Sequence, residues 1–335
     1  MSVIFVDGTS HYSPAQITRK WGAHSGASIS SYGPRSGASS ILLASGDWLR
    51  SVAFSALTNR IVLGYRHYHY MGSGRLYLMS GTTVQLTLEW DTDGSMTLYR
   101  GTESGTELAS AAAGTLPSDG WAWNYVEIDA TIDDSTGAVE VCVNGSTVDD
   151  LTVTSEDTQP DTTTGVDRFQ LNCTASQCNF TDFYVDTDTL NGDCAVYTLR
   201  PSAAGASTDF VPSAGDNYEN ADDDSSDDDG SYNSSTDQGD KDTFAFEDLP
   251  ALGIASTILA VAENVTLRKD DASTRQLKPV IRIGSTDYPH ATAAEAISSY
   301  AMHQRIWTVN PDDAAAFEDA DVNNAEFGYE QSLVS

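Results

Sequence analysis

The sequence lacks the features of membrane-spanning, secreted and nucleic-acid-binding proteins. Its best apolar stretch, residues 249–262, is shorter than the roughly 18 residues that cross a bilayer, and it contains Gly253. The opening MSVIFVDGTS has neither the basic region nor the long apolar core of a secretory signal. Only 17 residues are Lys or Arg against 49 Asp or Glu, and the formal net charge of −32 repels phosphates and anionic lipids. We therefore expect no nucleic-acid partner and no membrane insertion.

Lysine is especially scarce, and Asp greatly outnumbers Glu. This composition is typical of a halophilic protein that stays hydrated in concentrated salt. There the Debye length falls to about 3 Å at 1 M, and the repulsion between acidic side chains is screened. The composition thus indicates a salt-adapted, acidic protein, or an ordinary acidic protein from seawater.

Helical periodicity is almost absent, and short alternating runs of apolar and polar residues take its place. Strands are predicted over residues 61–65, 75–79, 84–90, 95–99, 125–131, 139–144, 147–153, 168–172 and 180–186. Turn signals separate several of these runs, for example Asn144-Gly145, which favours a type I′ hairpin turn. This pattern predicts an antiparallel, jelly-roll-like β-sandwich over residues 1–200.

A second region begins after Arg200-Pro201 and contains an acidic loop at residues 221–229. Strands are predicted at 243–246, 254–265, 280–283 and 328–334, with a short C-terminal helix that starts near residue 314 and extends into 319–327. At 335 residues the chain has room for two separate cores. The expected fold is all-β, with a second antiparallel sandwich over residues 201–335.

The four cysteines suit buried thiols better than a metal site. Cys142 and Cys194 lie in strand-like runs, where small buried thiols are common. Cys173 and Cys178 flank a short polar turn, so either a local disulfide or two free thiols fit this pair. A zinc site is not favoured, because no second Cys-x-x-Cys motif or paired histidine lies nearby.

Several segments resemble a family of tailed-phage virion proteins with a laminin-G or concanavalin A-like domain. The segments are Val6-Asp7-Gly8, His11-Tyr12 and Lys20-Trp21 at the start, residues 181–186 and 191–193 near the end of the first region, residues 199–205 and 212–220 at the junction, and residues 310–312, 321–323 and 326–328 at the end. The chain departs from the family at Phe317, where a tryptophan is common, and at Thr181, the first of two positions that are often acidic.

The resemblance implies a structural protein on the particle surface of a tailed virus, such as a capsid decoration, turret or tail-associated subunit. Its expected partners are copies of itself and other virion proteins. The alternative function is a virion adhesion module that binds a host-surface glycan.

Calcium is the one metal that the sequence favours, because sandwiches of this type often hold it at loop carboxylates. Ca²⁺ takes 6–8 oxygen ligands, which clustered acids can supply. The candidate ligands are Asp182, Asp186, Asp188 and Asp193, or else the acidic tract at 222–229. The alternative is that these residues are solvated loop acids in a protein rich in acids. No EF-hand spacing is present, and no other cofactor is expected.

Trp121 and Trp123 flank Ala122 and therefore share one face, so they are the candidate glycan-binding pair, unless they pack into a core. In Arg66-His67-Tyr68-His69-Tyr70 the alternation of His and Tyr predicts an interface or a partly buried strand. His67 and His69 would share a face and could bind a transition metal, although no third ligand is evident.

Enzymatic activity is not expected. The chain has no Gly-x-Ser-x-Gly elbow, P-loop or GxGxxG motif. Glu127 and Asp129 have the spacing of a carboxylate pair on one strand face, but they also fit an ordinary strand with its polar side outward.

Overall fold

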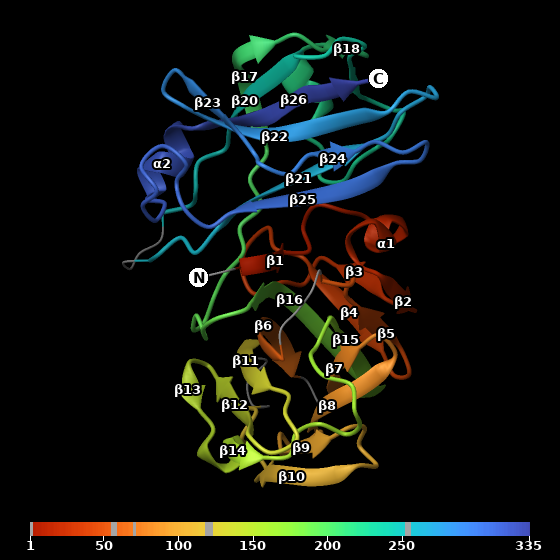
Figure 1. The fold of residues 1–335 in the computed structure, drawn as a ribbon, viewed down its shortest axis with the longest axis vertical. Helices are drawn as coiled ribbons and strands as arrows, with labels where there is room; N and C mark the ends of the chain where they lie inside the picture. The colour runs from red at the N-terminus through yellow and green to blue at the C-terminus, as the bar shows by residue number, and fades with distance from the viewer. Residues whose placement is uncertain (1–2, 55–58, 70–71, 118–122, 252–255) are drawn as a thin grey trace. The chain divides into compact units, whose positions relative to one another are not determined.

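The computed structural model describes residues 3–54, 59–69, 72–117, 123–251 and 256–335, and Figure 1 shows its fold. The chain forms two compact units, Met1–Val196 and Tyr197–Ser335. The regular secondary structure of both units consists almost entirely of antiparallel strands, as the sequence predicts. Among the described residues, no helix is long and apolar enough to cross a membrane.

The first unit is a sandwich of two antiparallel sheets. One sheet, here called the platform sheet, has the order β13-β12-β11-β6-β16-β4-β3, with β1 on β16 and β14 on β12. Its strands are β1 (Val3–Asp7), β3 (Ser28–Ser30), β4 (Ser40–Ala44), β6 (Arg60–His69), β11 (Trp123–Thr131), β12 (Gly137–Val143), β13 (Ser146–Thr147), β14 (Val153–Glu156) and β16 (Gln177–Asp186).

The opposite sheet has the order β10-β9-β8-β7-β15-β5-β2. Its strands are β2 (Ala23–Ser25), β5 (Trp48–Arg50), β7 (Ser73–Ser80), β8 (Thr83–Trp90), β9 (Met96–Arg100), β10 (Thr106–Ala111) and β15 (Arg168–Ala175). Short helical turns lie at η1 (Pro14–Gln16), α1 (Ile17–Lys20) and η2 (Asp149–Leu151). In Figure 1, β11 and β12 lie to the left of this unit, and β7 and β5 lie to the right.

The core of the first unit lies between these two sheets, where alternate side chains of both interdigitate. Its largest fully buried side chains include Trp21, Trp90, Tyr65, Phe169 and Phe180. Strand β16 differs from a usual two-faced strand, because all of its residues after Gln177 are buried. A strand is buried on both faces only if something covers its outer face, and residues 187–196 cover part of it.

The first strands of the chain carry the motif that gave the family resemblance, and its residues meet around one buried carboxylate. Asp7 accepts hydrogen bonds from the Tyr12 hydroxyl at 2.7 Å, the Trp21 Nε1 at 2.8 Å and the Thr9 amide at 2.8 Å. Lys20 lies 4.5 Å from the centre of the Phe5 ring, and burial lowers its pKa to about 8. The spacing of the motif therefore serves a buried polar network that fixes β1 and α1.

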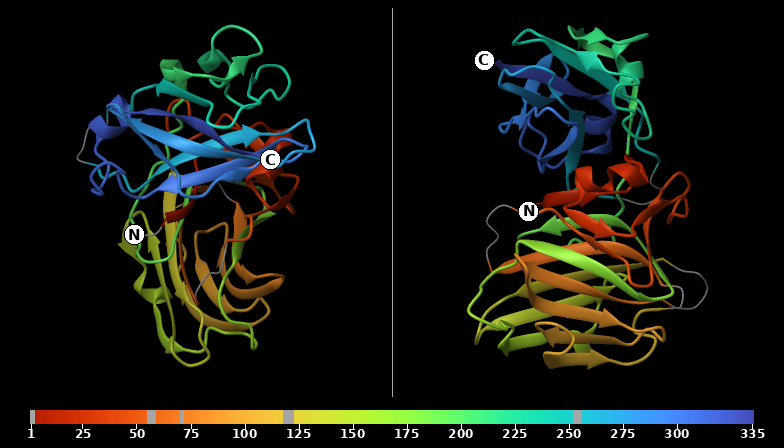
Figure 2. Two further views of the ribbon diagram at one scale, coloured as in Figure 1. Left: turned by 45° about the horizontal axis from the view of Figure 1, so that its top comes forward. Right: turned by 90° about the vertical axis from the view of Figure 1, so that its right-hand side faces the viewer.

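The second unit also has two layers. One sheet has the order β17-β20-β26-β22-β23, with β24 on β22, and the β21-β25 and β18-β19 pairs are separate. The elements are β17 (Pro201–Thr208), β18 (Val211–Pro212), η3 (Asn217–Asn220), β19 (Asn233–Ser234), β20 (Lys241–Phe246), β21 (Val261–Leu267), β22 (Arg275–Ile283), β23 (Thr286–Pro289), β24 (Ala294–Glu295), β25 (Ala301–Trp307), α2 (Asp319–Asn324) and β26 (Glu326–Val334). Figure 2 shows the same strands from two further sides.

The core of the second unit lies between the β21-β25 pair and the larger sheet. It contains Ile281, Trp307, Phe317 and Phe327, and Val322 of α2 closes one end. Phe317 thus fills a core position at the place where the resembling family often has a tryptophan. It is 4% exposed.

Some predicted boundaries are wrong. The predicted strand over 147–153 is divided into β13 and β14 by the turn η2. Residues 254–255 of the predicted strand over 254–265 lie outside the described residues, and in the described part the strand spans Val261–Leu267. The helix begins at Asp319 rather than near Ala314, because Ala314 has a positive φ of 60° and Glu318 caps the helix with Asp321.

Candidate functional site

The outer face of the platform sheet carries a row of polar and aromatic side chains. Trp123 of β11 pairs with Tyr68 of β6, which pairs with Asn179 of β16. One step along the strands, Tyr125 pairs with Arg66. Because side chains alternate between the faces of a strand, these residues point away from the core that their neighbours fill.

Three aromatic rings meet at one end of this outer face, and we call Tyr32, Tyr68 and Trp123 the aromatic platform. The ring centroids are 5.0 Å apart for Tyr32 and Tyr68, 5.7 Å for Tyr32 and Trp123, and 5.4 Å for Tyr68 and Trp123. Tyr32 and Trp123 stack with an angle of 24° between their planes. Tyr32 is 45% exposed, Trp123 is half-buried and Tyr68 supports both with 6% exposure.

Side-chain hydrogen bonds hold Tyr32 in place although it lies in a loop. Its amide donates to the Ser30 Oγ at 3.1 Å, and its carbonyl accepts from the Ser40 Oγ at 2.6 Å. The Ser40 Oγ in turn accepts from the Asn179 Nδ2 at 2.9 Å. Ser40 and Asn179 are buried residues of β4 and β16, so the sheet fixes the backbone of Tyr32.

Of the two predicted glycan-binding tryptophans, the structure describes Trp123. Trp123 is part of the aromatic platform, whereas Trp121 lies outside the described residues. Sequence reasoning missed Tyr32 and assigned Tyr68 to an interface. Tyr32 lies in a Gly- and Ser-rich loop with no periodic pattern, so the sequence carries no signal that brings it to Trp123.

Asp182 forms the centre of an ionic network beside the aromatic platform. It is fully buried, with a φ of 52° at an irregularity in the pairing of β16 with β6. Arg35 donates to both of its oxygens, at 2.7 and 2.6 Å, and Arg66 donates through Nε at 3.1 Å. The Val196 amide adds a fourth hydrogen bond at 3.0 Å. Both carboxylate oxygens are therefore bound by guanidinium groups.

The four acids of the predicted calcium site do not gather. Asp182 is bound as above, and Asp193 forms an ion pair with Arg66. Asp186 is buried and accepts hydrogen bonds from the Asp188 amide at 2.8 Å and from the Asn191 Nδ2 at 3.3 Å. Within the described ranges, no three acidic, histidine or cysteine side chains are placed to hold a metal. Arginine neutralises two of the four carboxylates, and calcium binding at these acids stays a prediction.

Residues 187–196, here called the crossing segment, cover the part of the outer face of the platform sheet that lies beside the aromatic platform. Leu190 and Cys194 pack against Val62, Tyr125 and Tyr184. Burial raises the pKa of Cys194 to about 12. The crossing segment thus covers β16 at Tyr184 and Asp186, and residues 8–9 cover Thr181.

Glu127 anchors the crossing segment to β11. Its Oε1 accepts hydrogen bonds from the Tyr184 hydroxyl, from the Asn191 amide at 3.0 Å and from the Gly192 amide at 2.9 Å. Asp129, two residues along the strand, binds Arg60 through both oxygens at 2.9 and 2.6 Å. The carboxylate pair with hydrolase-like spacing is thus held by protein partners.

The predicted interface residues lie on different faces. His67 is fully buried between the sheets, with its ring stacked 4.9 Å from Phe180 and 5.0 Å from Trp90. His67 thus fits the alternative of a partly buried strand, and an interface role for this segment stays a prediction. Tyr68 points outward into the aromatic platform. The His69 side chain and Tyr70 lie outside the described residues.

Cys173 and Cys178 are neighbours in the structure but are held as free thiols. They lie on β15 and β16, which belong to opposite sheets, and both are buried. The hydrogen bond with Cys173, together with burial, raises the pKa of Cys178. The Cys178 thiol also donates to the Ser73 carbonyl at 3.6 Å, and the Cys173 thiol donates to the Ala175 carbonyl at 3.4 Å.

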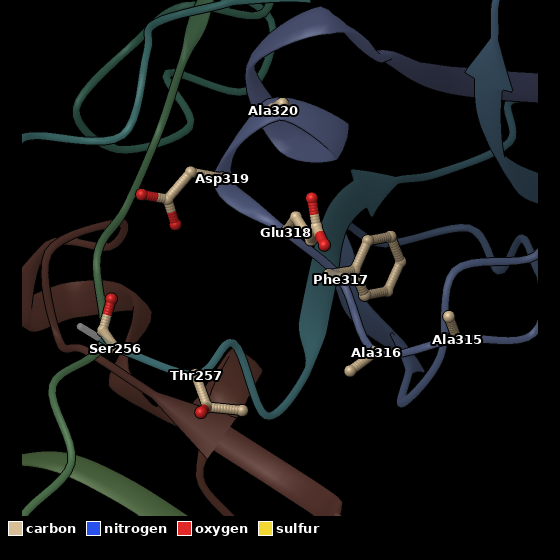
Figure 3. A pocket seen from close by; sticks show the side chains of 8 residues that line it. All are labelled: Ser256, Thr257, Ala315, Ala316, Phe317, Glu318, Asp319 and Ala320. Atoms are coloured by element: carbon tan, nitrogen blue, oxygen red, sulfur yellow. The ribbon is translucent and has the colours of Figure 1, made fainter.

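The second unit has an open hollow of about 700 Å³, lined by residues 256–257 and 315–320 (Figure 3). Glu318 and Asp319 are its charged side chains, and alanines form much of the remaining wall. Glu318 is engaged in capping α2. Among the residues described there, the hollow offers neither a cation nor an exposed aromatic ring to a ligand.

No protein-family model and no curated protein matches this chain. Solved structures with a similar fold include the carbohydrate recognition domain of Emp46p in its metal-free form, with 10% identity, 49% of this chain and 88% of that chain covered, and a TM-score of 0.35. They also include the VIP36 exoplasmic/lumenal domain with Ca²⁺ and Man3GlcNAc bound. It has 8% identity and a TM-score of 0.37, with 57% of this chain and 93% of that chain covered. A third is a glycosyl hydrolase family protein from Mycobacterium fortuitum. It has 12% identity and a TM-score of 0.38, with 56% of this chain and 100% of that chain covered.

These neighbours are lectin-like and hydrolase-like β-sandwiches. Their identities and TM-scores are too low to transfer a ligand or a reaction to this chain. Nothing in the comparisons bears on a virus or phage origin, so the virion role and the particle-surface location stay predictions.

Proposed function

We propose that the first unit is a non-catalytic carbohydrate-binding module and that a sugar ring stacks on the aromatic platform. The observation that carries the proposal is the cluster of Tyr32, Tyr68 and Trp123, in which Tyr32 is 45% exposed. Aromatic rings offer a large, rigid apolar surface, and the C–H face of a pyranose is the apolar face of an otherwise polar molecule. Stacking on such a platform removes both apolar surfaces from water.

The fixed position of Tyr32 supports this proposal. Ser30 and Ser40 hold the Tyr32 backbone, and its ring packs on Tyr68 and Trp123. A ring that is already ordered loses little conformational freedom when a ligand binds, and this pre-organisation favours affinity.

The absence of catalysis is part of the proposal. A glycosidase needs one carboxylic acid and one carboxylate free to face the glycosidic bond. Glu127 and Asp129 each have protein partners, and the crossing segment lies over Glu127. The proposed module therefore binds a glycan without cleaving it. On a virion it would serve the adhesion role that the sequence suggested as the alternative.

The test is a glycan array with the full chain, followed by calorimetric titration of the best ligand. Tyr32→Ala removes the exposed ring and should weaken binding about tenfold or more, as for the loss of about 1.4 kcal/mol at a binding hot spot. The matched control is Tyr232→Ala, which removes a tyrosine of similar exposure (43%) from the second unit.

The control variant should bind like the unchanged protein. Equal affinity of the Tyr32→Ala variant and the control, or no glycan bound by the full chain, would refute the proposal. Release of reducing sugar from the bound glycan would refute its non-catalytic part.

A further inference from the structure

The charges around the aromatic platform determine which class of sugar can bind there. An inference about this class rests on the proposed function. Residues 1–196 contain 23 Asp or Glu and 9 Lys or Arg, a formal net charge of −14. An acidic sugar approaching this unit is repelled as a whole, most strongly at low salt where the Debye length exceeds about 10 Å. It could bind only if a local cation received its carboxylate or sulfate group.

Two arginines adjoin the aromatic platform, and both are already neutralised. Arg66 lies two residues from Tyr68 on the same strand face and binds Asp182, Asp193 and the Cys194 carbonyl. Arg35 lies three residues from Tyr32, and it binds both oxygens of Asp182 and the Val196 carbonyl. The two guanidinium groups thus face two carboxylates and leave no excess positive charge.

Recruiting either arginine to a ligand would break this network. Asp182 is fully buried, so the loss of a guanidinium partner would leave its charge poorly compensated away from water. A carboxylate on the ligand would also lose its own hydration without gaining a free cation in return. Neutral hydroxyl and N-acetyl groups meet neither penalty.

We infer that the aromatic platform selects uncharged sugars over sialylated, uronic or sulfated ones. Stacking then supplies the affinity, and the ionic network supplies the discrimination. Since an uncharged ligand has no net electrostatic interaction with the protein, its affinity should be nearly independent of salt.

The experiment compares matched ligands that differ only in charge, for example lactose with sialyllactose and a neutral glycan with its sulfated form. Titrations are run at about 50 and about 500 mM NaCl, which changes the screening length severalfold. At the lower salt concentration, the neutral ligand should bind at least about tenfold more tightly than the acidic ligand. The difference in affinity between the two ligands should decrease at the higher salt concentration, because the repulsion of the acidic ligand is screened.

The Asp193→Asn variant tests the local part of the inference. It removes one carboxylate from Arg66 and should improve binding of the acidic ligand about threefold while leaving the neutral ligand unchanged. Asp150→Asn, at an exposed residue elsewhere in the unit, changes the net charge equally and serves as the control. Equal effects of the two variants would overturn the role of the arginine network.

The outcomes separate this inference from the proposed function. Acidic sugars that bind as tightly as neutral ones, with Tyr32→Ala weakening both, would overturn the inference and leave carbohydrate binding in place. Failure of every ligand to bind would instead overturn the proposed function itself.

Discussion

Removing the carboxylate of Asp182 should strongly destabilise the first unit. Asp182→Ala deletes four hydrogen bonds, three of them from guanidinium groups. The arginines are mostly covered, with side-chain exposures of 21% for Arg35 and 15% for Arg66, so water can only partly replace the lost anion. Breaking a buried ion pair by removing one partner costs about 3–5 kcal/mol. For a unit of this size, 1 kcal/mol shifts Tm by about 2–4 °C, so we expect a decrease of about 6–20 °C.

The assay is thermal and guanidinium-induced unfolding of the full chain, followed by circular dichroism and tryptophan fluorescence. Asp150→Asn is the control, because an exposed carboxylate without a buried partner should change stability by less than about 0.5 kcal/mol. A double-mutant cycle with Arg35→Met measures the coupling of Arg35 to Asp182 directly. We expect the double variant to be less destabilised than the sum of the two single variants.

Calcium distinguishes the ion-pair network from the metal site that the sequence suggested. If Asp182 binds only arginine, Ca²⁺ and EDTA should leave the Tm of the unchanged protein where it is. The reasoning fails if Asp182→Ala is no less stable than Asp150→Asn. It also fails if Ca²⁺ raises the Tm of the unchanged protein and Asp182→Ala abolishes that rise.

Two further substitutions test one position in each unit. In Gly64→Ala the new Cβ would overlap the Tyr184 ring and lie 2.9 Å from the Tyr125 hydroxyl. We expect the free energy of unfolding in urea to decrease by about 1–3 kcal/mol, and unchanged stability would contradict the close packing under the crossing segment. Burial raises the pKa of Glu263 well above its usual value, so its contribution to stability is complete below the unfolded pKa of about 4.3 and is lost as the pH rises towards the folded pKa. Glu263→Gln should remove this pH dependence and raise the free energy of unfolding near pH 7 by about 1–3 kcal/mol. An unchanged slope of stability against pH would contradict the raised pKa of Glu263 as the cause.

The alternation of apolar and polar residues determined the fold class without help from the structure. Runs such as residues 84–90 and 125–131 have a period of two, and this period is a local property of the chain that fixes which side chains a strand can bury. The turn signal Asn144-Gly145 likewise lies in the hairpin between β12 and β13, with a positive φ at both residues. Composition alone determined the charge on which the neutral-sugar inference depends.

Only the tertiary structure decided which distant residues meet. Tyr32 reaches Trp123 because β3 and β4 pair at one side of β16 while β11 lies beyond β6, an order set by contacts between strands far apart in the chain. Arg35 and Asp182 are 147 residues apart, so no local pattern could show that an arginine neutralises an apparent calcium ligand. The sequence therefore determined the elements and the overall charge. The sheet topology determined the site, because a binding surface depends on cross-strand neighbours rather than on neighbours in the chain.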